Sequence, residues 1–354
     1  MTAADGAPPV TAGRPGERAA EAVPGYVGGT PLLRVRDLTV TFASRGRRNV
    51  QAVDGLSLDV AAGSTVGIVG ESGSGKSVTA LAALGLLPSR GVRVSGTVEL
   101  DGRDLLTMPE QELRQVRGRD VAMVFQDPMS ALNPVLTVGR QLTEVLERHR
   151  QLRGAGAKQE AAALLASVGI AEPRRRLGSW PHQLSGGMRQ RVMIAMALAC
   201  SPRLIVADEP TTALDVTISA QILELLRTLV AERDTALVLI THDLGVVAGL
   251  CDQVHVMYSG RIVESASRQE LFAEPRHPYT TGLLASVPRL DQPRGVPLRP
   301  IPGSPSDVLP WTRGCAFAPR CTRRVEACTG TAPGLAPYGP RHAVRCVNPV
   351  EERP

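Results

Sequence analysis

The stretch STVGIVGESGSGKSVTALAALGLL, residues 64–87, decides how the first part of this chain folds. An apolar run ends at Val69 and a helix-forming run begins after Ser77, so the sequence predicts a strand, a loop and a helix in that order. The loop has the pattern G-x-x-x-x-G-K-S in the context that this pattern requires. The stretch therefore predicts a phosphate-binding loop (P-loop) between a strand and a helix.

Each part of this loop suits the phosphates of a nucleoside triphosphate. Glycines let successive backbone N–H groups converge on phosphate, and the helix N-terminus adds its positive end. Lys76, one of only two lysines in the chain, is expected to contact the β- and γ-phosphates, and the Ser77 hydroxyl is expected to ligate Mg²⁺. The predicted phosphate-binding residues are Gly70, Ser72, Gly73, Ser74, Gly75, Lys76 and Ser77.

A second apolar run, LIVADE at residues 204–209, ends in two carboxylates. Adjacent strand residues point to opposite faces, so the two carboxylates can have different roles. Asp208 is expected to hold Mg²⁺, and Glu209 to polarise the attacking water as a general base. An acidic pair alone is more often a solvated strand end, and it is the P-loop that favours the catalytic interpretation.

A third motif, LSGGMRQR at residues 184–191, precedes a predicted helix. Ser185 is a natural N-cap, and Gly186 and Gly187 leave backbone N–H groups accessible. The motif predicts a second phosphate-binding helix terminus. Without its flanking residues, an SGG sequence before a helix would be interpreted as an ordinary cap.

Strand-like and helical runs alternate along the chain, which predicts an α/β layer fold. From Leu136 to Ile170 the apolar residues follow helical spacing, so a helical insertion is expected between two halves of the sheet. Beyond Glu274 the composition changes, because the last 80 residues contain 15 of the 28 prolines and four of the six cysteines. A separate small C-terminal module is expected to begin there.

Composition and charge exclude several classes of protein. No window of about 18 uncharged apolar residues is present, so no membrane-spanning helix is predicted. The first 30 residues lack an apolar core and predict a disordered leader rather than a signal peptide, so the protein is expected in the cytoplasm. The net charge of +6 does not indicate nucleic-acid binding, because residues 1–275 carry 29 basic and 29 acidic side chains.

Together these motifs resemble those of the ATP-binding cassette (ABC) ATPases over residues 31 to about 265. They follow the family's order: the P-loop, Gln126 in VFQDP, LSGGMRQR, LIVADEP, Asp215 in TALD, and His242 in LITHD. The resemblance implies an α/β P-loop ATPase with a RecA-like core, an antiparallel β subdomain and a helical signature subdomain. The implied organisation is a leader at 1–30, an ATPase domain at 31–275 with its helical subdomain at about 127–200, and a loop-rich C-terminal domain at 276–354.

The resemblance also assigns roles to single residues. It implies that Gln126 senses Mg²⁺ and water, that His242 contacts the γ-phosphate, and that Asp215 reports across a dimer. Phe42 resembles the aromatic residue that stacks on adenine, although a buried strand residue is nearly as good an interpretation. In this family the signature Ser185-Gly186-Gly187 of one subunit closes on ATP held by another, so dimerisation with itself or with a related cassette is implied.

Two further motifs resemble the peptide/nickel importer ATPases, namely MSALNP at residues 129–134 and HPYT at residues 277–280. This implies a motor subunit that couples ATP hydrolysis to uptake of peptides or a related small solute, nickel included. The implied partners are a second ABC ATPase, by family habit a paralogue, two membrane permeases and an extracytoplasmic binding protein, with the chain at the cytoplasmic face of the membrane. The solute itself is not encoded in this sequence.

Other classes of cassette protein fit less well. Relatives that act on DNA insert long heptad coiled coils between P-loop and signature, translation-type relatives usually carry two cassettes, and exporters often fuse transmembrane helices. None of these features occurs in this sequence. The sequence therefore favours an importer subunit over these alternatives.

The tail cysteines Cys315, Cys321, Cys328 and Cys346 have the spacing C-x5-C-x6-C-x17-C. Four thiolates suit Zn²⁺ or an iron–sulfur cluster, and the C-x2-C pairs usual in zinc ribbons are absent. The tail resembles that of relatives with a [4Fe-4S] centre, and nearby arginines would offset the cluster's charge. Zinc and free thiols remain alternatives. Because the nucleotide motifs lie upstream, ATP binding is expected to survive loss of a cysteine.

Overall fold

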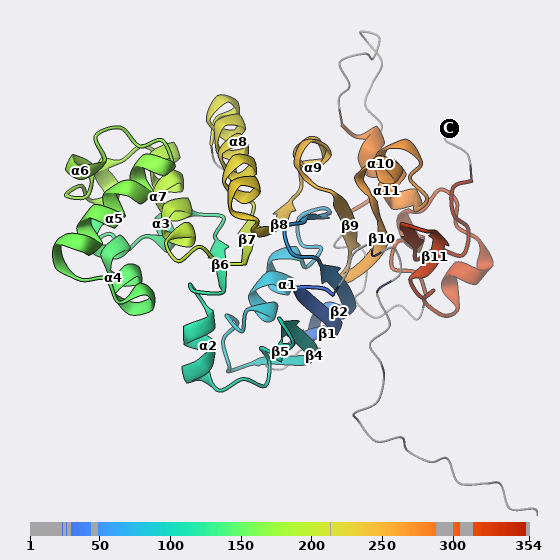
Figure 1. Cartoon of the computed structure of the whole chain (residues 1–354). Helices are drawn as coiled ribbons and strands as arrows, with labels where there is room; N and C mark the ends of the chain where they lie inside the picture. Colours follow the sequence, from blue (N-terminus) through green and yellow to red (C-terminus); the bar gives the residue numbers. More distant parts are fainter. Residues whose placement is uncertain are drawn as a thin grey trace, which may run out of the picture.

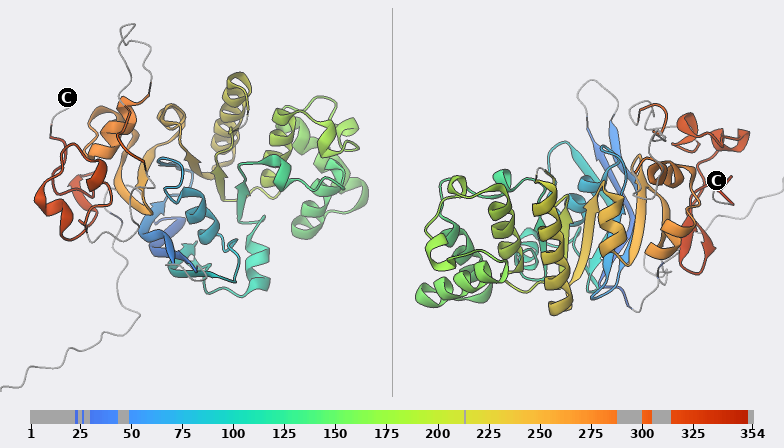
Figure 2. Two further views of the ribbon diagram at one scale, coloured as in Figure 1. Left: turned by 180° about the vertical axis from the view of Figure 1, so that it is seen from behind. Right: turned by 90° about the horizontal axis from the view of Figure 1, so that it is seen from above.

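The structure is a computed structural model, and it describes residues 23, 26, 30–43, 49–212, 214–287, 300–304 and 314–351. Most of the predicted leader lies outside these residues. The described chain forms two sheets, a cluster of helices at one end of the molecule and a loop-rich C-terminal segment at the other (Figures 1 and 2).

An antiparallel sheet is built from the first strands of the chain. Its described strands lie in the order β2-β1-β4-β5: β1 (Leu33–Phe42), β2 (Val50–Val60), β4 (Val92–Leu100) and β5 (Arg103–Asp104). Leu33, Val35, Leu38 and Val40 of β1 are all buried. The two-residue alternation of buried side chains is interrupted between Val35 and Leu38, where the register with β2 shifts. A bulge there returns the apolar residues to the core face.

The second sheet positions the predicted motifs. Its order is β11-β12-β10-β9-β3-β8-β7-β6, with bounds β3 (Thr65–Val69), β6 (Val121–Val124), β7 (Leu204–Asp208), β8 (Ala236–Thr241), β9 (Gln253–Tyr258), β10 (Arg261–Ser267), β11 (Ala336–Gly339) and β12 (His342–Val344). Strands β6, β7, β8, β3 and β9 are parallel. The loops that follow these strands therefore leave from the same edge of the sheet.

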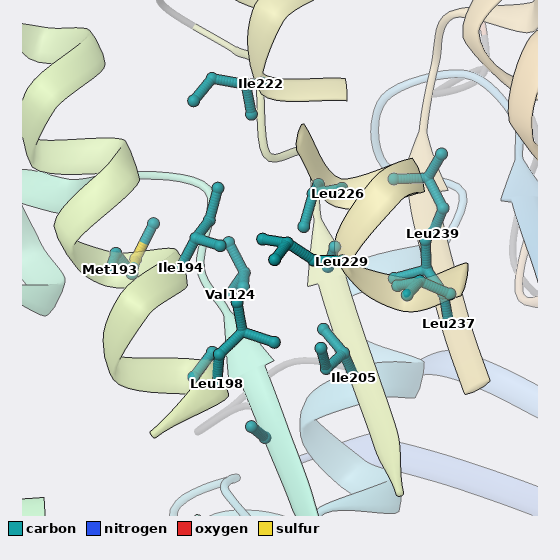
Figure 3. Packing of buried hydrophobic residues seen from close by; sticks show 14 of the residues in the cluster. Val124, Met193, Ile194, Leu198, Ile205, Ile222, Leu226, Leu229, Leu237 and Leu239 are labelled. Atoms are coloured by element: carbon teal, nitrogen blue, oxygen red, sulfur yellow. The ribbon is translucent and has the colours of Figure 1, made fainter. Parts of the chain in front are cut away.

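The parallel strands are apolar along their length because both of their faces are covered. Every residue of β7 and β8 is buried. On one face, Ile205 and Leu239 lie in a core with Leu226 and Leu229 of α8 (Val216–Arg233) (Figure 3). The remaining helices of the core are α1 (Lys76–Ala83), α2 (Glu110–Val116), α9 (Leu244–Leu250), α10 (Arg268–Ala273) and α11 (Pro278–Ala285).

Helices between β6 and β7 form the separate cluster (Figure 1). They are α3 (Pro128–Ala131), α4 (Val138–Arg150), α5 (Gly154–Ser167), α6 (Pro173–Arg176), the 3₁₀ turn η1 (Pro181–Gln183) and α7 (Gly186–Leu198). Helices α4 and α5 fall in the run expected to be helical, and buried Leu142, Leu146 and Leu165 join them to the main core. None of the helices in the described ranges is long and apolar enough to span a membrane.

The C-terminal segment continues the main sheet. Strand β12 pairs with β10 through Glu264 and Val344, Ser265 and Ala343, and Ala266 and His342. The turns η3 (Ala318–Arg320) and η4 (Glu326–Thr329) carry the cysteine-bearing loops. Strands from beyond residue 275 thus extend the ATPase sheet, and the boundary of a separate C-terminal module near residue 275 stays a prediction.

Candidate active site

The P-loop connects β3 to α1 in a conformation that needs glycine. Gly73 and Gly75 have φ of 79° and 103°. A Cβ atom on Gly75 would lie 2.4 Å from the carbonyl oxygen of Ala52, so the loop also approaches the antiparallel sheet too closely for a side chain. None of the side chains that the structure describes caps α1 at Gly75. Its first N–H groups therefore remain available to an anion.

Lys76 lies folded back over this loop. Its side chain is almost fully buried, and Nζ donates hydrogen bonds to the carbonyl oxygens of Gly70 (2.9 Å) and Glu71 (3.0 Å). Burial lowers the pKa of Lys76, while the carboxylates of Glu209, Asp208 and Glu71 oppose that shift. The ammonium group thus lies beside the loop where predicted.

The two predicted magnesium ligands are in direct contact. The Ser77 hydroxyl donates to Oδ1 of Asp208 over 2.9 Å. Burial raises the pKa of Asp208, and the hydrogen bond from Ser77 partly offsets that rise. Hard oxygen donors beside the phosphate loop fit Mg²⁺, and the charge of such a cation would stabilise the ionised carboxylate.

Glu209 is the meeting point of three segments that are distant in sequence. Its carboxylate accepts hydrogen bonds from Gln126 (3.0 Å) and Thr212 (2.8 Å) and lies 3.4 Å from Nδ1 of His242. Glu209 itself has a φ of 45°, an uncommon conformation for a residue with a side chain. These contacts fix the carboxylate at the strand end. Thr212 is a site contact that the sequence analysis did not single out.

These groups surround one open cavity of about 610 Å³. Its lining includes the predicted residues Gly70, Ser72, Gly73, Gly75, Lys76, Ser77, Gln126, Glu209 and His242. The described residues that line it do not include Phe42, which is half-buried and lies against the core of the antiparallel sheet. Adenine stacking on Phe42 stays a prediction.

The signature motif lies elsewhere in the same chain. Ser185 caps α7 by accepting a hydrogen bond from the N–H of Met188, and Asp215 caps α8 by accepting one from Ile218. The two caps are neighbours, because a Cβ on Gly187 would lie 2.7 Å from Ile218. Among the described residues, those that line the P-loop cavity include neither cap. The signature helix terminus is therefore not part of the described lining of the chain's own nucleotide cavity.

The four tail cysteines line a single small cavity together with His277 and Arg323. Burial raises the pKa of Cys346 to about 11, and the other three thiols add to that rise. In the part of the chain that the structure describes, no group of three or more metal-ligating side chains is close enough to form a ready-made metal site. The cavity nevertheless brings together the four cysteines that the sequence analysis grouped.

The tail also reaches the P-loop. Arg320 forms an ion pair with Glu71, and the Tyr279 hydroxyl accepts a hydrogen bond from the N–H of Glu71. The expectation that ATP binding survives loss of a tail cysteine stays a prediction. The contacts of Arg320 and Tyr279 show that tail residues touch the P-loop, and neither of the two was predicted as a site residue.

Comparisons with known proteins agree with this geometry. Residues 53–212 match the ABC transporter family, and residues 263–328 match the oligopeptide/dipeptide transporter C-terminal region. The chain is 51% identical over 321 residues to the oligopeptide transport ATP-binding protein OppD of Salmonella typhimurium, covering 91% of this chain and 95% of that one. It is 50% identical over 316 residues to the dipeptide transport ATP-binding protein DppD of Bacillus subtilis, covering 89% and 94%.

A solved structure is similar as well. The dimeric post-hydrolysis state of the ATP-binding cassette MJ0796, bound to ADP and Pi, superposes with a TM-score of 0.60 at 29% identity, covering 67% of this chain and 98% of that one. The predicted fold class and ATPase activity are thereby confirmed, with ATP and Mg²⁺ as the expected ligands. The chain belongs to the family of ABC transporter ATP-binding proteins that includes the oligopeptide and dipeptide transport ATP-binding proteins.

Proposed function

We propose that this chain is the ATP-hydrolysing subunit of a peptide importer, in which ATP binding closes two cassettes and hydrolysis reopens them. The observation that carries the proposal is the position of Ser185, which is not among the described residues that line the cavity of the chain's own P-loop. A nucleotide in that cavity would need the signature of a second ABC ATPase subunit. The similar cassette MJ0796 is described as a dimer, which supports this arrangement.

Within a closed site, each residue would have one task. Lys76 and the loop N–H groups would hold the phosphates, and Ser77 with Asp208 would hold Mg²⁺. Glu209 would polarise the attacking water, which His242 and Gln126 would help to place. The contact between Gln126 and Glu209 supports a link between the base and the segment that enters the helical cluster.

An apolar groove supports a permease as partner. A cavity of about 250 Å³ between the core and the helical cluster is lined by Leu86, Phe125, Met193 and Met196 among others. Leu86 and Phe125 are each 37% exposed, an unusual state for large apolar residues that lie together. A short apolar helix of a membrane subunit would fit there, and Phe125 adjoins Gln126. Such a partner would hold the chain at the cytoplasmic face of the membrane as a peripheral subunit.

Peptide is the proposed solute, because the named function of the similar proteins is oligopeptide or dipeptide transport. The test is a reconstitution of the chain with its permeases, partner ATPase and binding protein in vesicles. Peptide should stimulate ATP hydrolysis and should accumulate inside the vesicles. With Glu209→Gln in the assembly, neither hydrolysis nor accumulation should occur. Stimulation and uptake with nickel but not with peptides would contradict the peptide assignment and leave the ATPase assignment intact.

We also propose a [4Fe-4S] cluster in the tail. Cys315, Cys321, Cys328 and Cys346 would be its ligands, because all four residues line one cavity. Burial raises the pKa of Cys315, and hydrogen bonds from the backbone N–H groups of Phe317 and Ala318 oppose that rise by favouring the thiolate. When bound, such a cluster would cross-link loops that have little regular structure of their own.

The proposed cluster leads to two predictions, one for the metal content of the protein and one for the resistance of the tail to proteolysis. Anaerobically purified protein should contain roughly four irons per chain and absorb broadly near about 400 nm. Cys328→Ser should make residues 314–351 sensitive to proteolysis. The same substitution at Cys200, a cysteine outside the tail, should leave the sensitivity of these residues unchanged. If metal analysis finds one zinc and no iron per chain, the four cysteines form a zinc site instead of a cluster. If it finds neither metal, the four cysteines are free thiols.

A further inference from the structure

The P-loop of this chain contains a carboxylate where phosphates are expected to bind. Glu71 directly follows Gly70, lines the nucleotide cavity, and has a side chain that is 27% exposed. A negative charge at this place repels the phosphates of ATP. Burial lowers the pKa of Lys76 and the charge of Glu71 opposes that shift, so an unpaired Glu71 would compete with phosphate for that ammonium group.

Arg320 of the tail neutralises this carboxylate. Its guanidinium donates to both oxygens of Glu71, with Nη1 to Oε2 at 2.7 Å and Nη2 to Oε1 at 3.0 Å. The pair joins residues that are 249 positions apart in the sequence. This two-pronged geometry is the strongest that arginine and a carboxylate form, and it orients the carboxylate as well as neutralising it.

The surroundings hold Arg320 in that position. Its side chain is only 3% exposed. Nε donates to the carbonyl oxygen of Pro302 (2.8 Å), and the two Nη atoms donate to the Tyr258 hydroxyl (3.3 Å) and to the carbonyl oxygen of Gly303 (3.4 Å). With the two bonds to Glu71, all five N–H donors of the guanidinium have partners.

A second tail residue fixes the backbone at the same point. The hydroxyl of Tyr279 accepts the N–H of Glu71 over 2.8 Å. The Tyr279 ring is fully buried and lies 4.6 Å from the ring of Tyr258 and 5.3 Å from that of Phe317. The backbone of Glu71 is therefore held by an aromatic cluster that includes Phe317, two residues from Cys315. The Glu71 side chain is held by Arg320, which contacts the same cluster through the Tyr258 hydroxyl.

We infer that Arg320 is the counter-cation and positioning residue of Glu71, so that the tail completes the nucleotide site of its own chain. Arg320 bonds both oxygens of the carboxylate and cancels its charge, which leaves Lys76 and the loop free to bind phosphate. The inference uses only the ATP-binding activity. It depends neither on the identity of the solute nor on the cofactor proposed for the tail.

The inference predicts opposite effects of two substitutions on MgATP affinity in the full chain, measured by calorimetry. Arg320→Gln leaves the Glu71 charge unpaired, so the dissociation constant should rise about tenfold. Glu71→Gln leaves Arg320 with an uncompensated positive charge beside the phosphates, so binding should be as tight as in the wild type or tighter. In Glu71→Gln/Arg320→Gln both charges are gone, and affinity should return to within about threefold of wild type.

The control is Arg324→Gln, the same change at an exposed arginine of the same loop, which should bind MgATP as the wild type does. Two results would overturn the inference. If Arg320→Gln binds MgATP with wild-type affinity, Arg320 is not needed to neutralise Glu71. If the double variant binds MgATP as weakly as Arg320→Gln does, Arg320 acts only on the stability of the tail. If Arg320→Gln does not fold, Glu71→Gln alone tests the inference. Weaker MgATP binding by Glu71→Gln than by the wild type would contradict the proposed neutralisation of Glu71 by Arg320.

Discussion

Glu209→Gln is expected to bind MgATP as tightly as the wild type and to lose about 10²- to 10⁴-fold in hydrolysis, the range that a general base contributes. The amide keeps the shape of the carboxylate and can still accept hydrogen bonds from Gln126 and Thr212. It cannot take a proton from water. ATP binding without hydrolysis should therefore trap the closed dimer.

The measurement is the turnover number of the assembled transporter, together with the amount of nucleotide-trapped dimer. Glu232→Gln, the same change at an exposed glutamate near the end of α8, should leave both unchanged. Hydrolysis by Glu209→Gln at a rate near that of the wild type would assign the base to another residue.

Gly186→Asp is expected to abolish turnover in the assembly while leaving MgATP binding by the isolated chain intact. Among the described atoms, a Cβ at Gly186 would meet only Leu214, at an ordinary 3.5 Å, whereas one on Gly187 would lie 2.7 Å from Ile218 and disturb the packing. An acid in the first turn stabilises a helix, so α7 should still fold. Its charge would repel the γ-phosphate that the partner presents, and turnover should fall at least about 100-fold.

Gly156→Asp provides the matched control. It places the same charge in the first turn of α5, where a Cβ would contact none of the described atoms within 4 Å. Turnover of that variant should equal the wild-type value. Loss of MgATP binding in isolated Gly186→Asp would refute a role in trans, because the signature would then serve its own chain's nucleotide.

The site was predictable from sequence where parallel strands impose its geometry. The P-loop, Gln126, Glu209 and His242 follow β3, β6, β7 and β8, and parallel neighbours bring the segments after those strands to one edge of the sheet. Short motifs with fixed chemistry mark each of these positions. The order of the strands was not needed to predict that these residues cooperate.

The contact between Arg320 and Glu71 was not predictable in this way. The tail carries 11 arginines against five acidic residues from position 276 onward, and nothing in the pattern distinguishes Arg320 from its neighbours. Strands β11 and β12 have four and three residues, and one contains proline, so their addition to the main sheet carries little periodic signal. Partners of this kind are set by tertiary packing.

The most direct measurement of a nucleotide site shared between two chains is photolabelling with ATP that carries a reactive group on its γ-phosphate. In the assembled transporter closed with Mg²⁺, peptide mass spectrometry should find the label on residues 185–188 of this chain. The label should disappear when the partner subunit is made unable to bind nucleotide. Labelling of residues 185–188 in the isolated monomer, or labelling that persists with such a partner, would contradict the account.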